Sequence, residues 1–215
     1  DEIRQSMETF GKRPIERLHD LGLLSQRLLA VHMTRLTDGD IELAARYGVN
    51  VVHCPQSNLK LASGFCPVAR LLAAGINTTL GTDGAASNND LDMLGEMNTA
   101  ALLAKGVAGD PTAVPAMQAL RMATLDGARA LGMNEQIGSL EVGKQADVVA
   151  VDLERISTQP LYDPLSQLVY AAGHDQVTHV WVSGNLLYDN GEHTTLNPED
   201  ILERCRAWAK HIRDQ

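Results

Sequence analysis

Three short apolar segments in the first half of the chain each lead to a polar, titratable residue, and helix-like segments separate them. These pairs are residues 28–31 with His32, residues 49–52 with His53, and residues 76–81 with Asp83. Apolar, β-branched runs of this length are typical of buried strands. Strands that alternate with helices favour a parallel sheet, because a parallel connection requires a long crossover. The pattern therefore predicts an α/β fold, either a (β/α) barrel or an open sheet.

The segments between these strands carry helix signals. Thr37 is a typical N-cap and Gly48 a typical C-cap for a helix over residues 38–47. A loop through Gly64 leads to a second helix over residues 67–74. Further helices are expected over residues 3–21, 90–105, 115–122 and 126–131.

The pattern changes in the second half of the chain. A turn-rich link over residues 138–144 precedes a strand over residues 146–152. Gly184-Asn185 is a turn signal between two further strands, so it predicts an antiparallel hairpin in a small β-layer. A terminal amphipathic helix is expected from Asn197, its N-cap, and Pro198, its first residue.

Composition excludes several classes of protein. The net charge is −9 and no basic run supplies phosphate contacts, which disfavours nucleic acid or an anionic membrane as a partner. No apolar stretch reaches membrane-spanning length, and no signal-peptide pattern opens the chain. Cys54, Cys66 and Cys205 form no C-x-x-C pair, so we expect reduced thiols in a cytoplasmic protein.

His32, His53 and Asp83 should lie on one side of one sheet, because the carboxyl ends of parallel strands form the ligand side of both candidate folds. Two interpretations of Asp83 stay open: it binds a metal ion, or it caps a turn and the next helix. An Asp beside a metal can take a proton from water while a His holds that water. A catalytic zinc needs about three protein ligands, and the chain has no H-x-H or H-E-x-x-H motif.

Ser57 and Asn58 follow His53 in a predicted loop, where they either contact a substrate or close the loop by local hydrogen bonds. Cys54 is a possible nucleophile, but no adjacent base is evident, which favours an inert buried thiol. Lys60 is interpreted as a solvated charge.

Four segments together carry a resemblance to a known family. They are His32 after its apolar strand, residues 53–61 (HCPQSNLKL), residues 81–89 (GTDGAASNN) and residues 138–147 (GSLEVGKQAD). In these segments the chain resembles the amidohydrolase superfamily, and within it the 5-methylthioadenosine/S-adenosylhomocysteine deaminases and the related triazine chlorohydrolases. The resemblance covers nearly the whole chain.

The resemblance implies a (β/α)8 TIM barrel with a small β-sandwich built from both ends of the chain. Residues 1–137 would be the C-terminal part of the barrel, with strands six to eight and their helices. Residues 138–196 would be a portion of the β-sandwich, and residues 197–215 the C-terminal helix. The first half of the same enzyme would then be missing from this chain.

The resemblance also implies roles for particular residues. Asp83 would be the last ligand of one divalent metal ion, most simply Zn²⁺, and the base toward its water. His32 would hold the water or the forming oxyanion. Substrate contacts are expected from Asp83, Ser87, Asn58 and His53. The other three metal ligands and an acid/base Glu would lie in the missing half, so the chain alone is expected to be inactive.

The expected reaction is zinc-dependent deamination of an adenine nucleoside to its inosine analogue. The substrate would be 5-methylthioadenosine, S-adenosylhomocysteine or adenosine. One alternative is a hydrolase of the same fold that acts on s-triazines or guanine, and another is a scaffold that has lost catalysis. A homo-oligomer is also expected, although the apolar positions Leu102, Leu103 and Val107 are equally explained by a core-facing stripe.

Overall fold

The computed structural model describes residues 2–214, which form two compact units. The first unit contains the residues up to 144 together with 153–174, and the second contains 145–152 together with the residues from 175 onward. The predicted domain boundaries at 137 and 196 stay a prediction for the whole protein. Within this chain, residues 153–174 group with the first unit, because their helix packs against two of its helices.

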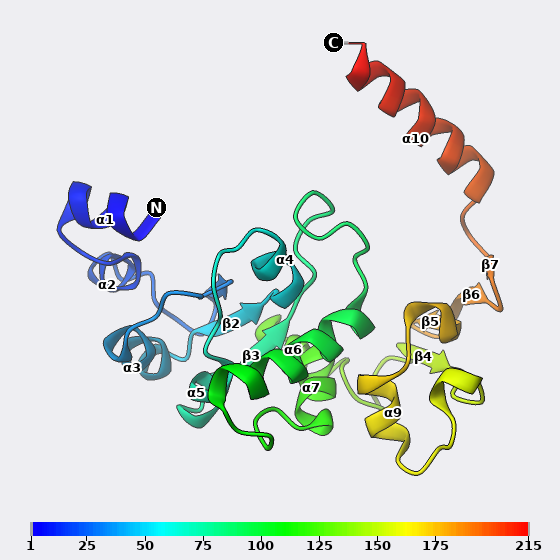
Figure 1. The fold of residues 1–215 in the computed structure, drawn as a ribbon, viewed down its shortest axis with the longest axis horizontal. Coiled ribbons are helices and arrows are strands. Elements are labelled where there is room, and N and C mark those ends of the chain that lie inside the picture. Colours follow the sequence, from blue (N-terminus) through cyan, green and yellow to red (C-terminus); the bar gives the residue numbers. More distant parts are fainter. Residues whose placement is uncertain (1, 215) are drawn as a thin grey trace. The chain divides into compact units, whose positions relative to one another are not determined.

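The first unit contains most of the helices and a parallel sheet (Figure 1). Its strands are β1 (Leu29–Val31), β2 (Asn50–His53) and β3 (Thr78–Leu80). Its helices are α1 (Glu2–Phe10), α2 (Pro14–Asp20), α3 (Asp38–Tyr47), α4 (Pro55–Lys60), α5 (Val68–Ala73), α6 (Met93–Ala108), α7 (Ala116–Ala123), α8 (Leu125–Ala130) and α9 (Pro164–Tyr170). A short 3-10 turn, η1 (Ile156–Thr158), precedes α9, and another, η2 (His174–Gln176), lies at the boundary between the units.

The sheet confirms the predicted parallel arrangement. Its strand order is β1-β2-β3, with Ala30 opposite Val51 and His53 opposite Leu80. The residues of β2 and β3 are buried except the half-buried Val52, whereas Leu29 and Val31 of β1 are 37% and 45% exposed. The prediction of a buried first strand is therefore wrong for β1, which is an edge of the sheet among the described residues.

Helix α3 shows how local sequence sets the length of an element. The Thr37 hydroxyl accepts a hydrogen bond from the backbone N–H of Asp40, and the Asp40 carboxylate accepts one from the Thr37 N–H. This reciprocal capping box satisfies N–H groups that have no partner within a helix. At the other end, Gly48 adopts φ 64°, where a residue with a Cβ is strained. The predicted bounds of this helix are confirmed.

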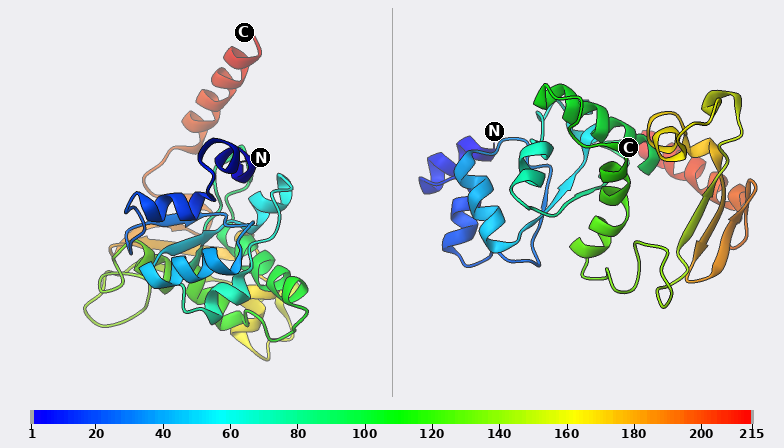
Figure 2. Two further views of the ribbon diagram at one scale, coloured as in Figure 1. Left: turned by 90° about the vertical axis from the view of Figure 1, so that its left-hand side faces the viewer. Right: turned by 90° about the horizontal axis from the view of Figure 1, so that it is seen from below.

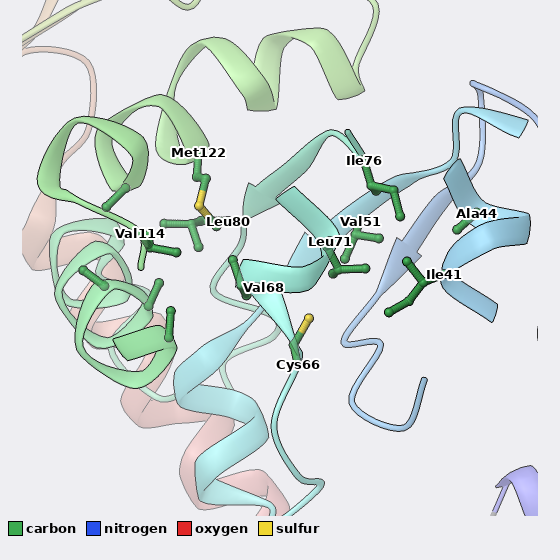
Figure 3. Packing of buried hydrophobic residues seen from close by; sticks show 14 of the residues in the cluster. Ile41, Ala44, Val51, Cys66, Val68, Leu71, Ile76, Leu80, Val114 and Met122 are labelled. Atoms are coloured by element: carbon green, nitrogen blue, oxygen red, sulfur yellow. The ribbon is translucent and has the colours of Figure 1, made fainter. Parts of the chain in front are cut away.

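The core of the first unit lies between the sheet and its covering helices (Figure 3). Leu71 from α5, Val51 from β2 and Met122 from α7 have no exposed surface and belong to one cluster. Burying a side chain of this size contributes roughly 1.5–3 kcal/mol. This packing fixes the direction of β2 and β3, and thus the position of the loops that follow them.

Two predicted elements differ from the structure. The expected helix over residues 3–21 is two helices, α1 and α2, because Gly11 adopts φ 66° and Pro14 begins α2. Proline has no N–H for a helical hydrogen bond, so it starts a helix more readily than it continues one. The expected loop after His53 contains α4, which also begins at a proline, Pro55. Ser57 and Asn58 therefore lie on a buried helix rather than in an open loop.

The second unit contains an antiparallel sheet with strand order β4-β5-β6-β7 (Figure 2). Its strands are β4 (Val148–Val151), β5 (Val177–Val182), β6 (Asn185–Asp189) and β7 (Glu192–His193). The predicted hairpin is confirmed, but its turn is Ser183-Gly184, both at positive φ, because Asn185 already pairs with Val182. Strand β7 was not predicted, since it contains only Glu192 and His193.

Helix α10 (Pro198–Arg213) begins as predicted, because the Asn197 side chain accepts a hydrogen bond from the Glu199 N–H. Its apolar residues are exposed within this chain: Ile201, Leu202, Trp208 and Ile212. In the part of the chain that the structure describes, no helix combines the length and hydropathy needed to cross a bilayer.

Candidate active site

Asp83 lies in the loop that follows β3, beyond the carboxyl end of the strand. One oxygen of its carboxylate accepts a hydrogen bond from the Ser57 hydroxyl at 2.7 Å, and the other accepts one from the Gly84 N–H at 2.8 Å. Hydrogen bonds from Ser57, and to a smaller extent from Ser87 and Gly84, lower the pKa of Asp83 to about 2. The side chain is about one-third exposed, so an ionised carboxylate faces an accessible space.

Asp83 does not cap the next helix. The N-cap of α6 is Asp92, whose carboxylate accepts a hydrogen bond from the Leu94 N–H. The interpretation of Asp83 as a helix cap is therefore wrong. One carboxylate oxygen of Asp83 accepts a hydrogen bond from the Gly84 N–H, which stabilises the turn that contains Asp83. The other oxygen accepts a hydrogen bond from the hydroxyl of Ser57 in α4.

His32 follows β1, and its Nε2 lies 3.8 Å from a carboxylate oxygen of Asp83. Its Nδ1 lies 2.9 Å from the side-chain oxygen of Asn58, which is buried. An amide oxygen only accepts, so Nδ1 carries the proton and the ring turns Nε2 toward Asp83. Strand β1, helix α4 and the loop after β3 thus bring His32, Asn58 and Asp83 together. The sequence predicts that His32 and Asp83 share this side of the sheet, and Asn58 reaches it from a helix that was not predicted.

Both His32 and Asp83 have left-handed backbone conformations, with φ values of 69° and 62°. Residues with a Cβ rarely adopt this conformation, and it costs of order 1–3 kcal/mol. Strain of this kind persists only where the surrounding structure fixes it, and it is typical of active sites.

His53 and Ser87 occupy different surroundings from those expected of simple substrate contacts. His53 is 1% exposed, and its Nδ1 has no hydrogen-bond partner among the described residues. Burial, and to a smaller extent His32, lowers the pKa of His53 to about 4, so the ring is neutral at pH 7. The single Ser87 hydroxyl proton is shared between the Gly84 carbonyl, at 3.0 Å, and Asp83, whose ionised form it stabilises. Their contact with a substrate stays a prediction.

Cys54 and Lys60 also belong to the segment around α4. Burial raises the pKa of the Cys54 thiol to about 12, which fits the inert thiol favoured by the sequence. Lys60 is more than a solvated charge, because its ammonium donates to the Ala86 carbonyl at 2.9 Å and so holds the loop after Asp83.

One group beside the site was not predicted. Glu96 of α6 has no exposed surface, and its carboxylate accepts hydrogen bonds from the Gln56 N–H and the Asn88 side chain. A carboxylate that shares the buried face of α6 with Met97 and Ala100 is the signal in the sequence that could have identified it.

Two cavities of the first unit lie at different ends of the sheet. One of about 620 Å³ is bordered by His32, Met33 and Ser63, and so lies beside the predicted site. The larger cavity, about 800 Å³, is bordered by Asn50 and Asn77 at the amino ends of the strands, away from His32 and Asp83. Size alone would select the wrong end, because ligands of parallel sheets bind at the carboxyl ends of the strands.

The donor atoms of this site suit a divalent metal only in part. A carboxylate oxygen and an imidazole nitrogen are both common zinc ligands, and Asp83 and His32 provide them within 3.8 Å of each other. Within residues 2–214, however, no group of three His, Cys, Asp or Glu side chains converges on one point.

Comparison with known proteins places these residues in a family. The model of the amidohydrolase family matches residues 1–187. A 5-methylthioadenosine/S-adenosylhomocysteine deaminase of Teredinibacter turnerae is 50% identical over 212 residues, which cover 99% of this chain and 48% of that protein. The chain thus spans about half the length of the curated relatives it matches.

Solved structures show the same relationship. An adenosine deaminase from Xanthomonas campestris with bound zinc is 54% identical, with a TM-score of 0.98 over 100% of this chain and 49% of the other. An atrazine chlorohydrolase from Arthrobacter aurescens, complexed with zinc, is 29% identical, with a TM-score of 0.88 over 96% of this chain and 46% of the other.

Proposed function

Because the chain belongs to the amidohydrolase family, we propose that it forms the C-terminal half of a metal-dependent aminohydrolase that deaminates an adenine nucleoside. The substrate would be 5-methylthioadenosine, S-adenosylhomocysteine or adenosine, and the products the inosine analogue and ammonia. The observation that carries this proposal is the cluster of Asp83, Ser57, His32 and Asn58 at the carboxyl ends of parallel strands. Relatives named as deaminases of these nucleosides support it.

Asp83 is the residue of this chain that would hold the metal, because its ionised carboxylate is accessible beside His32. When bound, a zinc ion acts as a Lewis acid and lowers the pKa of water toward neutrality. We propose that the other metal ligands and an acid/base Glu lie in the N-terminal half of the whole protein, which corresponds to the part of the relatives that this chain does not cover. On this proposal the chain contributes barrel strands six to eight and a share of a β-sandwich, and is inactive alone.

We propose a task for each of these side chains in this reaction. Asp83 accepts the proton of the attacking water, and the hydrogen bond from Ser57 holds the accepting oxygen in place. Asn58 fixes the His32 ring, so that Nε2 faces Asp83 and accepts a hydrogen bond from the attacking water. Ser87 supports the turn that carries Asp83. The neutral, buried His53 ends the middle strand, β2, between the strands that lead to His32 and Asp83.

The test is a substrate panel with the full-length protein. Ultraviolet absorbance reports the conversion of adenine to hypoxanthine, so 5-methylthioadenosine, S-adenosylhomocysteine, adenosine, guanine and a chlorotriazine are compared, together with the metal content. Deamination of an adenine nucleoside by a zinc-containing protein is the expected result. Turnover of the triazine instead would favour the alternative suggested by the similarity to atrazine chlorohydrolase. A protein without metal and without turnover would be the non-catalytic scaffold.

Variants test the residues. Asp83→Asn and Asp83→Ala should abolish turnover, while Asp90→Asn, a matched change in the same loop, should leave it near that of the native protein. Near-normal deamination by the Asp83 variants would overturn the assignment. His32→Ala should lower the rate and leave the metal content largely intact. Loss of the metal would instead identify His32 as a ligand.

A further inference from the structure

Glu96 is buried in surroundings that a contribution to the stability of the fold does not explain. The side chain has no exposed surface, and no lysine, arginine or histidine of residues 2–214 pairs with it. Burying a carboxylate without a cation is costly. An apolar residue would complete the buried face of α6 at lower cost, so the contacts of Glu96 call for another explanation.

The two hydrogen bonds of Glu96 reach both sides of the candidate active site. One carboxylate oxygen accepts from the Gln56 N–H at 3.3 Å, and Gln56 immediately precedes Ser57 in α4. The other accepts from the Asn88 side chain at 2.5 Å. The same Asn88 amide also donates to the carbonyl of Thr82, which immediately precedes Asp83. Glu96 is therefore bonded to the neighbours of both partners in the 2.7 Å hydrogen bond between Ser57 and Asp83.

We propose that Glu96 is a positioning residue that fixes Asp83 relative to Ser57 by holding α4 and the loop after β3 against α6. This inference rests on the proposed function of the same site. The loop has a second attachment through Lys60, whose ammonium donates to the Ala86 carbonyl. Loss of Glu96 should therefore displace the loop and leave it folded.

Glutamine cannot replace Glu96, although it has the same shape. When Glu96 is ionised, both of its oxygens accept, whereas Gln has one acceptor and one donor group. The NH2 group of Gln would then face either the Gln56 N–H or the Asn88 NH2 group, and each of these is itself a donor. Rotation of the Asn88 amide would restore one contact and lose the other, since Thr82 needs the Asn88 N–H that this rotation would remove.

The experiment compares Glu96→Gln and Asn88→Ala with the unchanged full-length enzyme. Glu42→Gln, the same change at an exposed position of α3, is the matched control. The assays are kcat and KM with the preferred nucleoside, zinc affinity by competition with a chelator, and the melting temperature. We expect kcat to fall about 10- to 100-fold, because small misplacements of a catalytic group have effects of this size. KM should change by less than about threefold, and zinc binding should weaken about tenfold as Asp83 loses its orientation.

Each outcome decides the inference. A kcat within about threefold of the unchanged enzyme in both variants would overturn it. A rise in KM with kcat and zinc affinity unchanged would overturn it too, because Glu96 would then act on substrate binding. If Glu96→Gln does not fold, Asn88→Ala decides alone, since it removes the bonds from Asn88 to Glu96 and to the Thr82 carbonyl and leaves the bond from the Gln56 N–H to Glu96. An unchanged enzyme that deaminates no nucleoside contradicts the proposed function, and zinc affinity still tests the positioning role.

Discussion

Raising the pH through neutrality should lower the free energy of unfolding of the metal-free protein, because Glu96 ionises in this range. Burial raises the pKa of this carboxyl from 4.5 to about 7, opposed by hydrogen bonds from Gln56 and Asn88, and nearby Asp90 and Asp92 raise it further. Cys54 also faces Glu96, but its thiol is uncharged below its own pKa of about 12. The folded state therefore keeps a proton on Glu96 at pH values where the unfolded chain has released it.

The sign and size of the effect follow from linkage. A raised pKa means that the contribution of Glu96 is most favourable below pH 4.5 and is lost as the pH rises through about 7. One pKa unit corresponds to about 1.4 kcal/mol, so between about pH 5 and about pH 8 the loss should be roughly 2–3 kcal/mol. Other carboxylates also titrate in this range, so the wild-type curve alone does not isolate the effect.

The assay is urea denaturation of full-length protein and its Glu96→Gln variant, both treated with a chelator, over that pH range. Gln does not titrate, so the stability difference between the two proteins should shift in favour of the variant by roughly 2–3 kcal/mol as the pH rises. Any fixed cost of the substitution cancels from this change. A difference that stays constant with pH, or shifts toward the wild type, would refute the reasoning.

Two further predictions concern packing and the thiols. Leu71→Ala should lower the free energy of unfolding by about 2.7–5 kcal/mol, measured by urea denaturation, because Leu71 is fully buried; a loss below about 1 kcal/mol would mean that the site collapses around the smaller side chain. Cys54 and Cys66 should resist iodoacetamide in the folded protein and react after denaturation, because burial raises the pKa of each thiol to about 12. Mass spectrometry of the alkylated protein checks this, and modification of either residue under native conditions would contradict it.

Much of the local structure could be predicted because it depends on neighbouring residues. Thr37 and Gly48 bound α3 through their own backbone and side-chain chemistry, and Asn197 begins α10 in the same way. The parallel sheet was also predictable, because helix-like segments between apolar runs leave few other connections. The elements that were misinterpreted depend on proline, which ends one element and begins the next, as Pro14 and Pro55 do.

The sequence predicted which strand ends carry residues of the candidate site, but not the contacts among their side chains. His32 and Asp83 were found because parallel strands place their carboxyl ends on one side. The hydrogen bond from Ser57 to Asp83 was not predictable, because it requires α4 to direct the Ser57 side chain toward Asp83. The role proposed for Glu96 was hidden for a similar reason, because it joins Asn88 of the preceding loop to Gln56, which is 40 residues away in sequence.

The sequence by itself determined most of the strands and helices, and that a carboxylate and an imidazole follow two of the strands. These properties arise from hydrophobic periodicity and capping, which act over a few residues. The tertiary structure alone decided that Asn58 orients His32, that Ser57 holds Asp83, and that a buried Glu96 joins α4 to the loop of Asp83. Such contacts depend on side-chain positions fixed by core packing, and packing brings together residues that local patterns cannot relate.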